Sequence, residues 1–175
     1  YEEGLAAEYN GDSGDSERDR REAESERLVG IARKNGQYVE PRVFDSLGER
    51  KSKPSGESTV YIDKDNGKVY KVKNPYAKAP MKGGVAPEDV IYEHLVHNKY
   101  FPETAYGFEG ISDDLGEARI ILSQDFVSSA RQATQGEVEA ALAAKGLRPE
   151  GNYRYGNDEV SVTDVTGDNL SLIHI

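Results

Sequence analysis

The sequence predicts an α+β fold in which an antiparallel sheet comes first and helices follow. Two β-rich runs at 58–62 and 68–72 flank a loop with Asn-Gly at 66–67, and Asn-Gly between such runs is a strong hairpin signal. A helical run over 87–99 begins with proline, which fits the first position of a helix. We therefore expect a small antiparallel lobe with one helix, followed by the start of a helical lobe.

The N-terminal segment differs in composition from the rest. Residues 1–15 are rich in Gly, Asp and Ser, which is typical of disorder. Residues 16–34 are mostly charged and predict a solvated helix that docks only by its end. Its apolar stripe would consist of Leu28, Ile31 and Ala32.

Three further elements follow along the chain. Residues 118–127 predict a buried strand, and the polar break after it would separate the two lobes. Residues 137–144 predict a helix, which Lys-Gly closes. Residues 158–164 predict a strand that enters a polar loop. The stretch over 37–50 reads as irregular.

Charge and composition exclude several classes of protein. The net charge is −10, which argues against a nucleic-acid surface, and residues 1–27 hold ten acidic and four basic side chains. The absence of cysteine excludes disulfides and thiolate metal sites. The sequence shows neither a signal-peptide pattern nor an apolar run of membrane-spanning length. We expect a cytoplasmic protein.

A candidate phosphate site lies in the predicted hairpin. A turn that contains Gly56 precedes its first strand, and Lys71 lies in its second strand. A glycine turn brings backbone N–H groups close to phosphate oxygens, and a strand lysine can reach the same oxygens. Lys73 shares the face of Lys71, so either could be the phosphate lysine. The turn holds one glycine where three are usual, and an ordinary hairpin with surface lysines is the alternative.

The helix over 87–99 offers a carboxylate partner for this lysine. Glu93 lies on a partly apolar stripe with Val90 and His97, so we expect it to face inward. Glu88 is the second choice. His94 and His97 are expected to form a helix-face pair and not a metal site.

The end of the chain offers the remaining chemistry. Asp164 and Asn169 have the D-x-x-x-x-N spacing of a kinase catalytic loop, about 90 residues after Lys71. In that spacing the aspartate accepts the proton of the attacking hydroxyl, and the asparagine coordinates Mg²⁺.

Several of these segments resemble one family, the Ser/Thr/Tyr-kinase-like domain of polyvalent proteins, which bacteriophages and conjugative elements encode. The resemblance runs over 28–169, and its segments occur in the family's order. Residues 97–104 (HNKYFPET) are similar to the family's H-N-x-x-F-P-E-T segment, and 163–169 also look like the D-L-H-P-G-N loop of aminoglycoside phosphotransferases. The other matching segments are 56–61, 66–72 and 137–147.

The resemblance implies a protein-kinase-like fold and an ATP- and Mg²⁺-dependent transfer of phosphate to a hydroxyl, in this case on a protein substrate. It implies Lys71 on the phosphates, Asp164 as catalytic base and Asn169 on the metal. Glu93 would pair with the lysine. The hinge whose backbone binds adenine would consist of Gln124, Asp125 and Phe126.

Two departures from the family pattern bear on activity. Val162-Thr163 replaces the His-Arg that usually precedes the catalytic aspartate, and the second metal-binding aspartate expected beyond Asn169 is absent. We therefore expect an inactive fragment of a larger multidomain protein. A nucleotide-binding pseudokinase, a small-molecule phosphotransferase and an interaction domain without a nucleotide site remain alternatives.

The expected organisation has four parts. Residues 1–27 form an acidic leader, 28–127 the first lobe and hinge, and 128–169 the start of the second lobe with its catalytic loop. Residues 170–175 (LSLIHI) are the translation of CTGTCTCTTATACACATC, a transposon-end sequencing adapter, and we interpret them as an artefact. A natural strand after the catalytic loop is the alternative. No role is assigned to His174.

Overall fold

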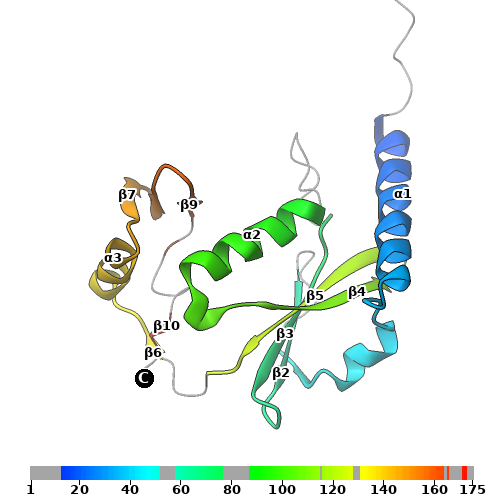
Figure 1. Ribbon diagram of the computed structural model, residues 1–175, viewed down its shortest axis with the longest axis horizontal. Helices are drawn as coiled ribbons and strands as arrows, with labels where there is room; N and C mark the ends of the chain where they lie inside the picture. Colours follow the sequence, from blue (N-terminus) through cyan, green and yellow to red (C-terminus); the bar gives the residue numbers. More distant parts are fainter. Residues whose placement is uncertain are drawn as a thin grey trace, which may run out of the picture.

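A computed structural model gives the arrangement of the chain (Figure 1). It describes residues 13–51, 58–76, 87–114, 116–127, 131–163, 165 and 171–172. A five-stranded antiparallel sheet has the order β1-β2-β3-β5-β4. Helix α2 covers one face of this sheet, α1 packs at the β4–β5 end, and a second group of elements follows. The expected α+β architecture is therefore confirmed, with a kinase-like antiparallel lobe first.

The sheet comprises β1 (Glu49–Arg50), β2 (Ser58–Asp63), β3 (Lys68–Lys73), β4 (Gly107–Asp114) and β5 (Glu117–Asp125). The α-helices are α1 (Ser13–Lys34), α2 (Pro87–Tyr100) and α3 (Gln135–Ala144), and the 3₁₀ turns are η1 (Pro41–Ser46) and η2 (Pro102–Thr104). The remaining strands are β6 (Arg131–Gln132), β7 (Arg148–Gly151), β8 (Arg154–Gly156), β9 (Ser161–Val162) and β10 (Ser171–Leu172).

The β2–β3 hairpin forms where the sequence predicted it. Asp63 pairs with Lys68 across the hairpin and closes the turn by accepting hydrogen bonds from the Asn66 backbone (3.0 Å) and side chain (2.7 Å). Gly67 adopts φ +63°, a left-handed conformation that glycine takes without steric cost. The predicted helix over 87–99 is α2, and the predicted helix over 137–144 is α3.

Each face of the sheet has its own hydrophobic cluster. On one face, Val90 of α2 packs against the buried Ile120 and Leu122 of β5. On the other face, Val72 and Ile121 pack under Phe44 of η1, so part of the stretch expected to be irregular forms a lid over the sheet. Side chains alternate between faces along a strand, which is why neighbouring residues of β5 serve both clusters.

Helix α1 docks more extensively than the sequence predicted. Its buried stripe is Ser25, Val29 and Ala32, whereas Ile31 is 47% exposed. The Ser25 hydroxyl accepts a hydrogen bond of 2.9 Å from the backbone N–H of Ala118 in β5. Of the expected stripe, Ala32 is buried and Leu28 packs beside it, whereas Ile31 does not contribute. Docking extends further along the helix than expected, because Ser25 in its charged part provides a buried polar contact. The expected disorder of residues 13–15 was wrong, since the helix begins at Ser13.

The C-terminal end of α1 is held by a second set of polar contacts. The Tyr38 hydroxyl donates a hydrogen bond of 2.5 Å to Asp113 of β4, and the Arg33 guanidinium lies 3.5 Å from the centre of the Tyr38 ring. Burial, together with the hydrogen bond to Asp113, raises the pKa of Tyr38 to about 12. These contacts fix α1 against the β4–β5 hairpin.

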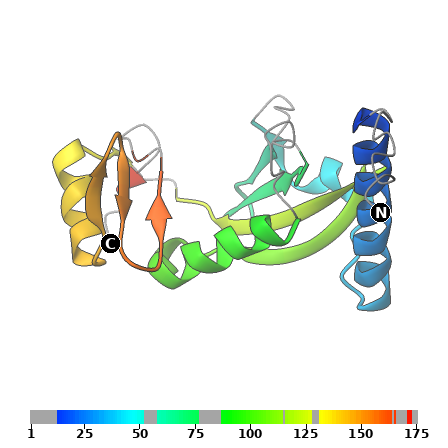
Figure 2. The same cartoon turned by 90° about the horizontal axis from the view of Figure 1, so that it is seen from above.

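The elements after β5 form a second group with its own core, which stands beside the end of α2 (Figure 2). The core contains Ala133, Val138, Leu142, Leu147, Tyr155 and Val165. Only residues 161–162 of the strand expected over 158–164 are extended in the described part of the chain. Before them, the Asn157 side chain accepts hydrogen bonds from the N–H groups of Glu159 (2.9 Å) and Val160 (3.0 Å), which makes a turn.

Two short pairings complete the description. Strands β7, β8 and β9 form a three-stranded antiparallel sheet, and β10 pairs with β6. The interpretation of residues 170–175 as an artefact stays a prediction. Among the described residues, no helix is both long and apolar enough to cross a bilayer.

Candidate functional site

Lys71 lies near the middle of the sheet, on β3. It is paired with Val60 of β2 on one side and with Leu122 of β5 on the other. Its side chain shares a face with Leu122, which is the face that α2 covers. In protein kinases the phosphate lysine also lies on the third strand, and the helix that follows packs behind it. The order of elements around Lys71 is therefore that of a kinase-like N-terminal lobe.

The direct partner of the Lys71 ammonium is Tyr106. The ammonium donates a hydrogen bond to the Tyr106 hydroxyl oxygen, and it lies 4.6 Å from the centre of the ring. Tyr106 lies between η2 and β4 and packs against the cluster of Val90, Ile120 and Leu122. Tyr106 was absent from the predicted site.

Glu93, the predicted carboxylate partner, is not brought to Lys71. It lies on the exposed side of α2, and no ion pair joins the two side chains. The helix instead turns Val90, His94 and His97 toward the sheet and Tyr106. The side chain of Glu88, the second choice, lies outside the described residues. Lys73 shares the face of Lys71 and is paired with Ile120.

Two histidine rings of α2 flank Tyr106. The His94 and His97 ring centres lie 4.7 Å and 4.9 Å from the Tyr106 ring centre, both in edge-to-face geometry. Burial, with smaller contributions from the charges of Lys73 and Lys71, lowers the pKa of His94 to about 4. Burial also lowers the pKa of His97. Burial thus disfavours a positive charge on both imidazoles, and the positive charge near His94 comes from Lys73 and Lys71.

The HNKYFPET segment closes the end of α2 and places Tyr106. A ring nitrogen of His97 (Nε2) lies 3.1 Å from the Thr104 carbonyl, to which it donates. The Asn98 amide donates to the Tyr106 carbonyl and accepts from the Tyr106 N–H, each at 2.7 Å. The segment identified from sequence thus folds into a support for the residue that contacts Lys71. The motif ends two residues before Tyr106, so it is the sequence signal that could have drawn attention to this residue.

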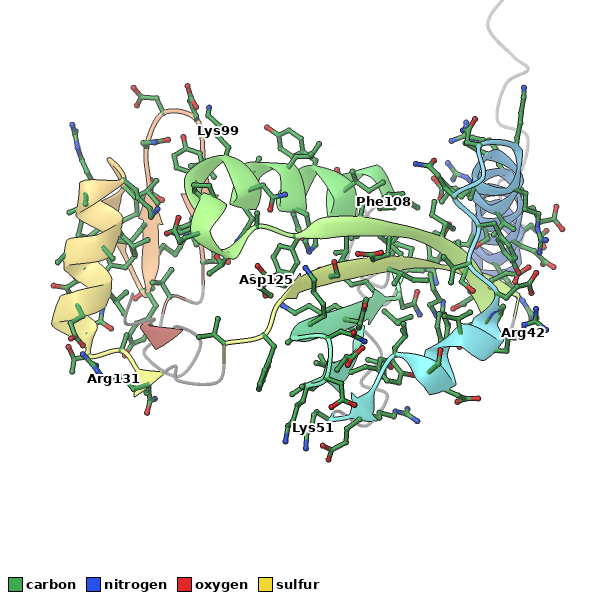
Figure 3. All side chains as sticks on the ribbon, turned by 60° about the horizontal axis from the view of Figure 1, so that its bottom comes forward. Arg42, Lys51, Lys99, Phe108, Asp125 and Arg131 are labelled. Carbon is green, nitrogen blue, oxygen red and sulfur yellow. The ribbon has the colours of Figure 1, made fainter. Side chains whose placement is uncertain are left out.

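The predicted hinge is anchored on two sides. The Gln124 side-chain amide donates a hydrogen bond of 2.5 Å to the Thr104 carbonyl. Asp125, at the end of β5 (Figure 3), accepts a hydrogen bond of 2.7 Å from Lys68. The backbone N–H of Phe126 donates to the Gly67 carbonyl at 2.9 Å. The first residues of the predicted hinge are therefore held against the first lobe. The backbone N–H of Phe126 already has a hydrogen-bond partner in the Gly67 carbonyl.

Three predicted site residues lie outside the described residues: Gly56, Asp164 and Asn169. Val165, next to Asp164, is buried in the second core, and its N–H donates to the Tyr153 carbonyl at 3.0 Å. Among the described residues, no group of three His, Cys, Asp or Glu side chains could hold a metal ion. The approach of Asp164 to Lys71 stays a prediction.

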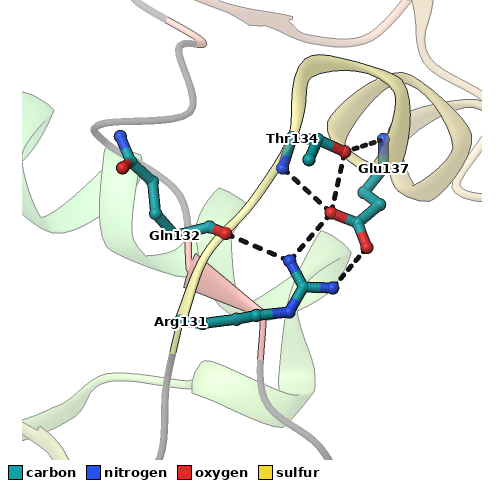
Figure 4. Close-up of polar contacts among 4 residues, drawn as sticks. All are labelled: Arg131, Gln132, Thr134 and Glu137. Atoms are coloured by element: carbon teal, nitrogen blue, oxygen red, sulfur yellow. Dashed lines mark hydrogen bonds and ion pairs between the residues drawn. The ribbon is translucent and has the colours of Figure 1, made fainter.

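A charged network precedes α3 and has a structural role (Figure 4). The Arg131 guanidinium binds both carboxylate oxygens of Glu137, one at 3.0 Å. Glu137 also accepts from the Thr134 N–H (2.9 Å), and Thr134 accepts from the Glu137 N–H (3.4 Å), which makes a capping box. The hydrogen bonds from Arg131 and Thr134 lower the pKa of Glu137 to about 2. The network fixes the start of α3, and the charges of Arg131 and Glu137 are paired with each other in this structural contact.

The fold and the placement of Lys71 define a kinase-like domain. Residues 21–174 match the family described as serine/threonine/tyrosine kinase found in polyvalent proteins. The chain belongs to this family. The matched region includes the docked half of α1, which supports the view that this helix is part of the domain. No curated protein and no solved structure matches the chain.

Proposed function

We propose that this domain, as part of a larger protein, binds ATP with Mg²⁺ and transfers the γ-phosphate to a hydroxyl group on a protein. The observation that carries the proposal is the position of Lys71. Its ammonium lies on the helix-covered face of the central strand, and no carboxylate is bonded to it among the described residues. A lysine with an uncompensated charge at this place of a kinase fold is suited to bind phosphate oxygens.

Each predicted residue has a distinct role in the proposed reaction. Lys71 would donate hydrogen bonds to the phosphates and orient them. Asp164 would accept the proton of the attacking hydroxyl, and Asn169 would hold Mg²⁺, which supplies charge neutralisation on the phosphates. The backbone of residues 124–126 would bind adenine. Little covalent chemistry is required of the protein, since positioning and electrostatics carry most phosphoryl transfer.

Binding of Mg·ATP to the full chain tests the first step. Lys71→Ala should weaken binding about tenfold or more, because it removes a charge-assisted contact to phosphate, and such contacts contribute roughly 1.5–3 kcal/mol. Lys68→Ala is the matched control, because Lys68 lies on the same strand but pairs with Asp125. Calorimetry with a non-hydrolysable ATP analogue measures both. Equal affinities of the wild type and Lys71→Ala would exclude the proposed phosphate site.

A nucleotide-binding pseudokinase is the second candidate. The exposed position of Glu93 favours it, because active protein kinases use a lysine–glutamate ion pair at this place. In the complete parent protein, radiolabelled ATP with mixed protein substrates and a panel of small-molecule alcohols, aminoglycosides included, separates the candidates. Binding without transfer supports the pseudokinase, and transfer to an aminoglycoside supports a small-molecule phosphotransferase.

We also propose how the domain is organised and where it acts. Residues 28–127 would carry the nucleotide lobe and hinge, and 128–169 would carry the catalytic loop. The domain would act in the cytoplasm of a bacterial host, as one part of a larger protein encoded by a phage or conjugative element. The family description places these kinases in polyvalent proteins, which supports the part of this proposal that concerns a larger protein.

A further inference from the structure

We infer that Tyr106 is the positioning residue for Lys71 and holds its ammonium at the phosphate site. In other protein kinases a helix carboxylate takes this role. The inference rests on the proposed function, because it assigns to Lys71 the task of binding phosphate. The first observation is the contact itself, since the Lys71 ammonium donates to the Tyr106 hydroxyl oxygen and Glu93 is exposed.

Tyr106 is held firmly enough to serve this role. Its backbone is fixed by the two reciprocal hydrogen bonds with Asn98, each 2.7 Å long. Its ring is flanked by His94 and His97 and packs against the apolar cluster under α2. A tyrosine side chain has only two torsions that move its ring, so contacts that fix the ring also fix the position of the hydroxyl oxygen. Lysine has a long flexible side chain, and a fixed acceptor removes much of that freedom before the nucleotide binds.

The chemistry of a phenol differs from that of a carboxylate in a way that suits phosphate. An ammonium has three N–H donors, and the Tyr106 oxygen uses one of them. Unlike a carboxylate, a phenol O–H brings no formal negative charge to the contact, so the charge of Lys71 is left for the ligand. Burial lowers the pKa of both neighbouring imidazoles, which disfavours their charged forms. The site therefore presents an oriented cation that no bonded carboxylate neutralises in the described part of the chain.

The geometry also connects Tyr106 to α2 in the way that a helix carboxylate would. Asn98 and the two histidines belong to α2, and all three contact Tyr106. The helix thus influences the lysine through an intermediate residue from the chain segment that follows it. This arrangement explains why the inward face of α2 carries histidines where a glutamate was expected.

A double-mutant cycle on Mg·ATP affinity tests the inference. Tyr106→Phe removes the hydroxyl and keeps the ring, and it should weaken binding about fivefold, the effect of one lost hydrogen bond. In a Lys71→Met background the same change should have no further effect, because Tyr106 acts through the lysine. Tyr70→Phe is the matched control, since Tyr70 lies on β3 but points to the opposite face. The inference is overturned if Tyr106→Phe binds Mg·ATP as tightly as the wild type. It is also overturned if the double mutant loses affinity by the product of the two single-mutant losses.

A spectroscopic measurement separates failure of this inference from failure of the proposed function. In the full chain with ¹³C-labelled lysine, Tyr106→Phe should shift the Lys71 ε-carbon and ε-proton resonances, whereas Tyr70→Phe should leave them in place. Asn98→Ala, which keeps Tyr106 but loosens its support, should shift them in the same direction by a smaller amount. If Lys71→Met leaves nucleotide affinity unchanged while these shifts occur, the proposed function fails and the contact stands. If Lys71→Met weakens binding and the resonances do not move, Tyr106 has no positioning role.

Discussion

The contact between Ser25 and Ala118 gives a sharp test of how α1 is attached. Ser25 is 3% exposed, and its hydroxyl accepts the N–H of Ala118, a residue with no exposed surface. Ser25→Ala would leave that N–H buried without a partner, which costs roughly 1–3 kcal/mol. Alanine gains about 0.5 kcal/mol over serine from helix propensity. The net expectation is a loss of about 0.5–2.5 kcal/mol in the stability of the docked helix.

Amide hydrogen exchange of Ala118, followed by NMR, measures this loss at the atom concerned. A free-energy change of that size corresponds to exchange faster by a factor of about 2 to 60, since each 1.4 kcal/mol is tenfold. Exchange at Leu142, in the second core, should not change, because that core has no contact with Ser25.

A second serine provides the control. Ser112 of β4 is also fully buried, but its hydroxyl has no hydrogen-bond partner among the described residues. Ser112→Ala removes a polar group that is desolvated without compensation, so stability should stay the same or rise slightly. If Ser112→Ala were more destabilising than Ser25→Ala, or if Ser25→Ala left Ala118 exchange unchanged, the reasoning about the docking contact would be refuted.

Two further predictions concern pH. Folding lowers the pKa of Glu137 to about 2. The stability that this carboxylate contributes is therefore present above its ordinary pKa of 4.5 and is lost as the pH falls toward 2. A ¹³C NMR titration should show that Arg131→Ala raises the pKa of Glu137, whereas Lys145→Ala should leave it unchanged. Folding lowers the pKa of His94 from 6.5 to about 4, so the unfolded chain takes up this proton first, and stability should fall between about pH 6.5 and 4. Urea unfolding at several pH values should show this slope reduced in His94→Gln, and an unchanged slope would contradict the assigned burial.

The sequence predicted elements best where local signals agree with the tertiary fold. The β2–β3 hairpin has Asn-Gly in its turn and β-branched residues in both strands, and α2 begins with proline. Strand β4 was missed because its sequence, GFEGISDD, has two glycines and three acids, which are poor strand formers. It is a strand because β5 pairs with it over its length, which is a non-local cause. The β7–β8 hairpin was missed for a related reason, since Asn152 and Tyr153 both have positive φ in a segment with Pro and Gly.

The candidate site was predicted in part. Lys71 was identified because its strand has a clear local signature, and the structure places it on the face that α2 covers. The predicted inward position of Glu93 followed from its stripe with Val90 and His97, yet helical spacing from Val90 also places His94 and His97 on one face. Periodicity could not choose between these faces, because both contain polar and apolar residues. Tyr106 could not be identified from spacing, since its contact with Lys71 depends on how β4 returns along the sheet.

The last turn of α2 belongs to both halves of the molecule. Tyr100 and Phe101 pack against the second core, and Lys99 and Lys145 form ion pairs across the junction, with Glu159 (2.5 Å) and Glu103 (2.8 Å). Helix α2 therefore joins the two halves as one element: its C-terminal end packs on the later core, and His94, His97 and Asn98 hold the tyrosine that contacts Lys71.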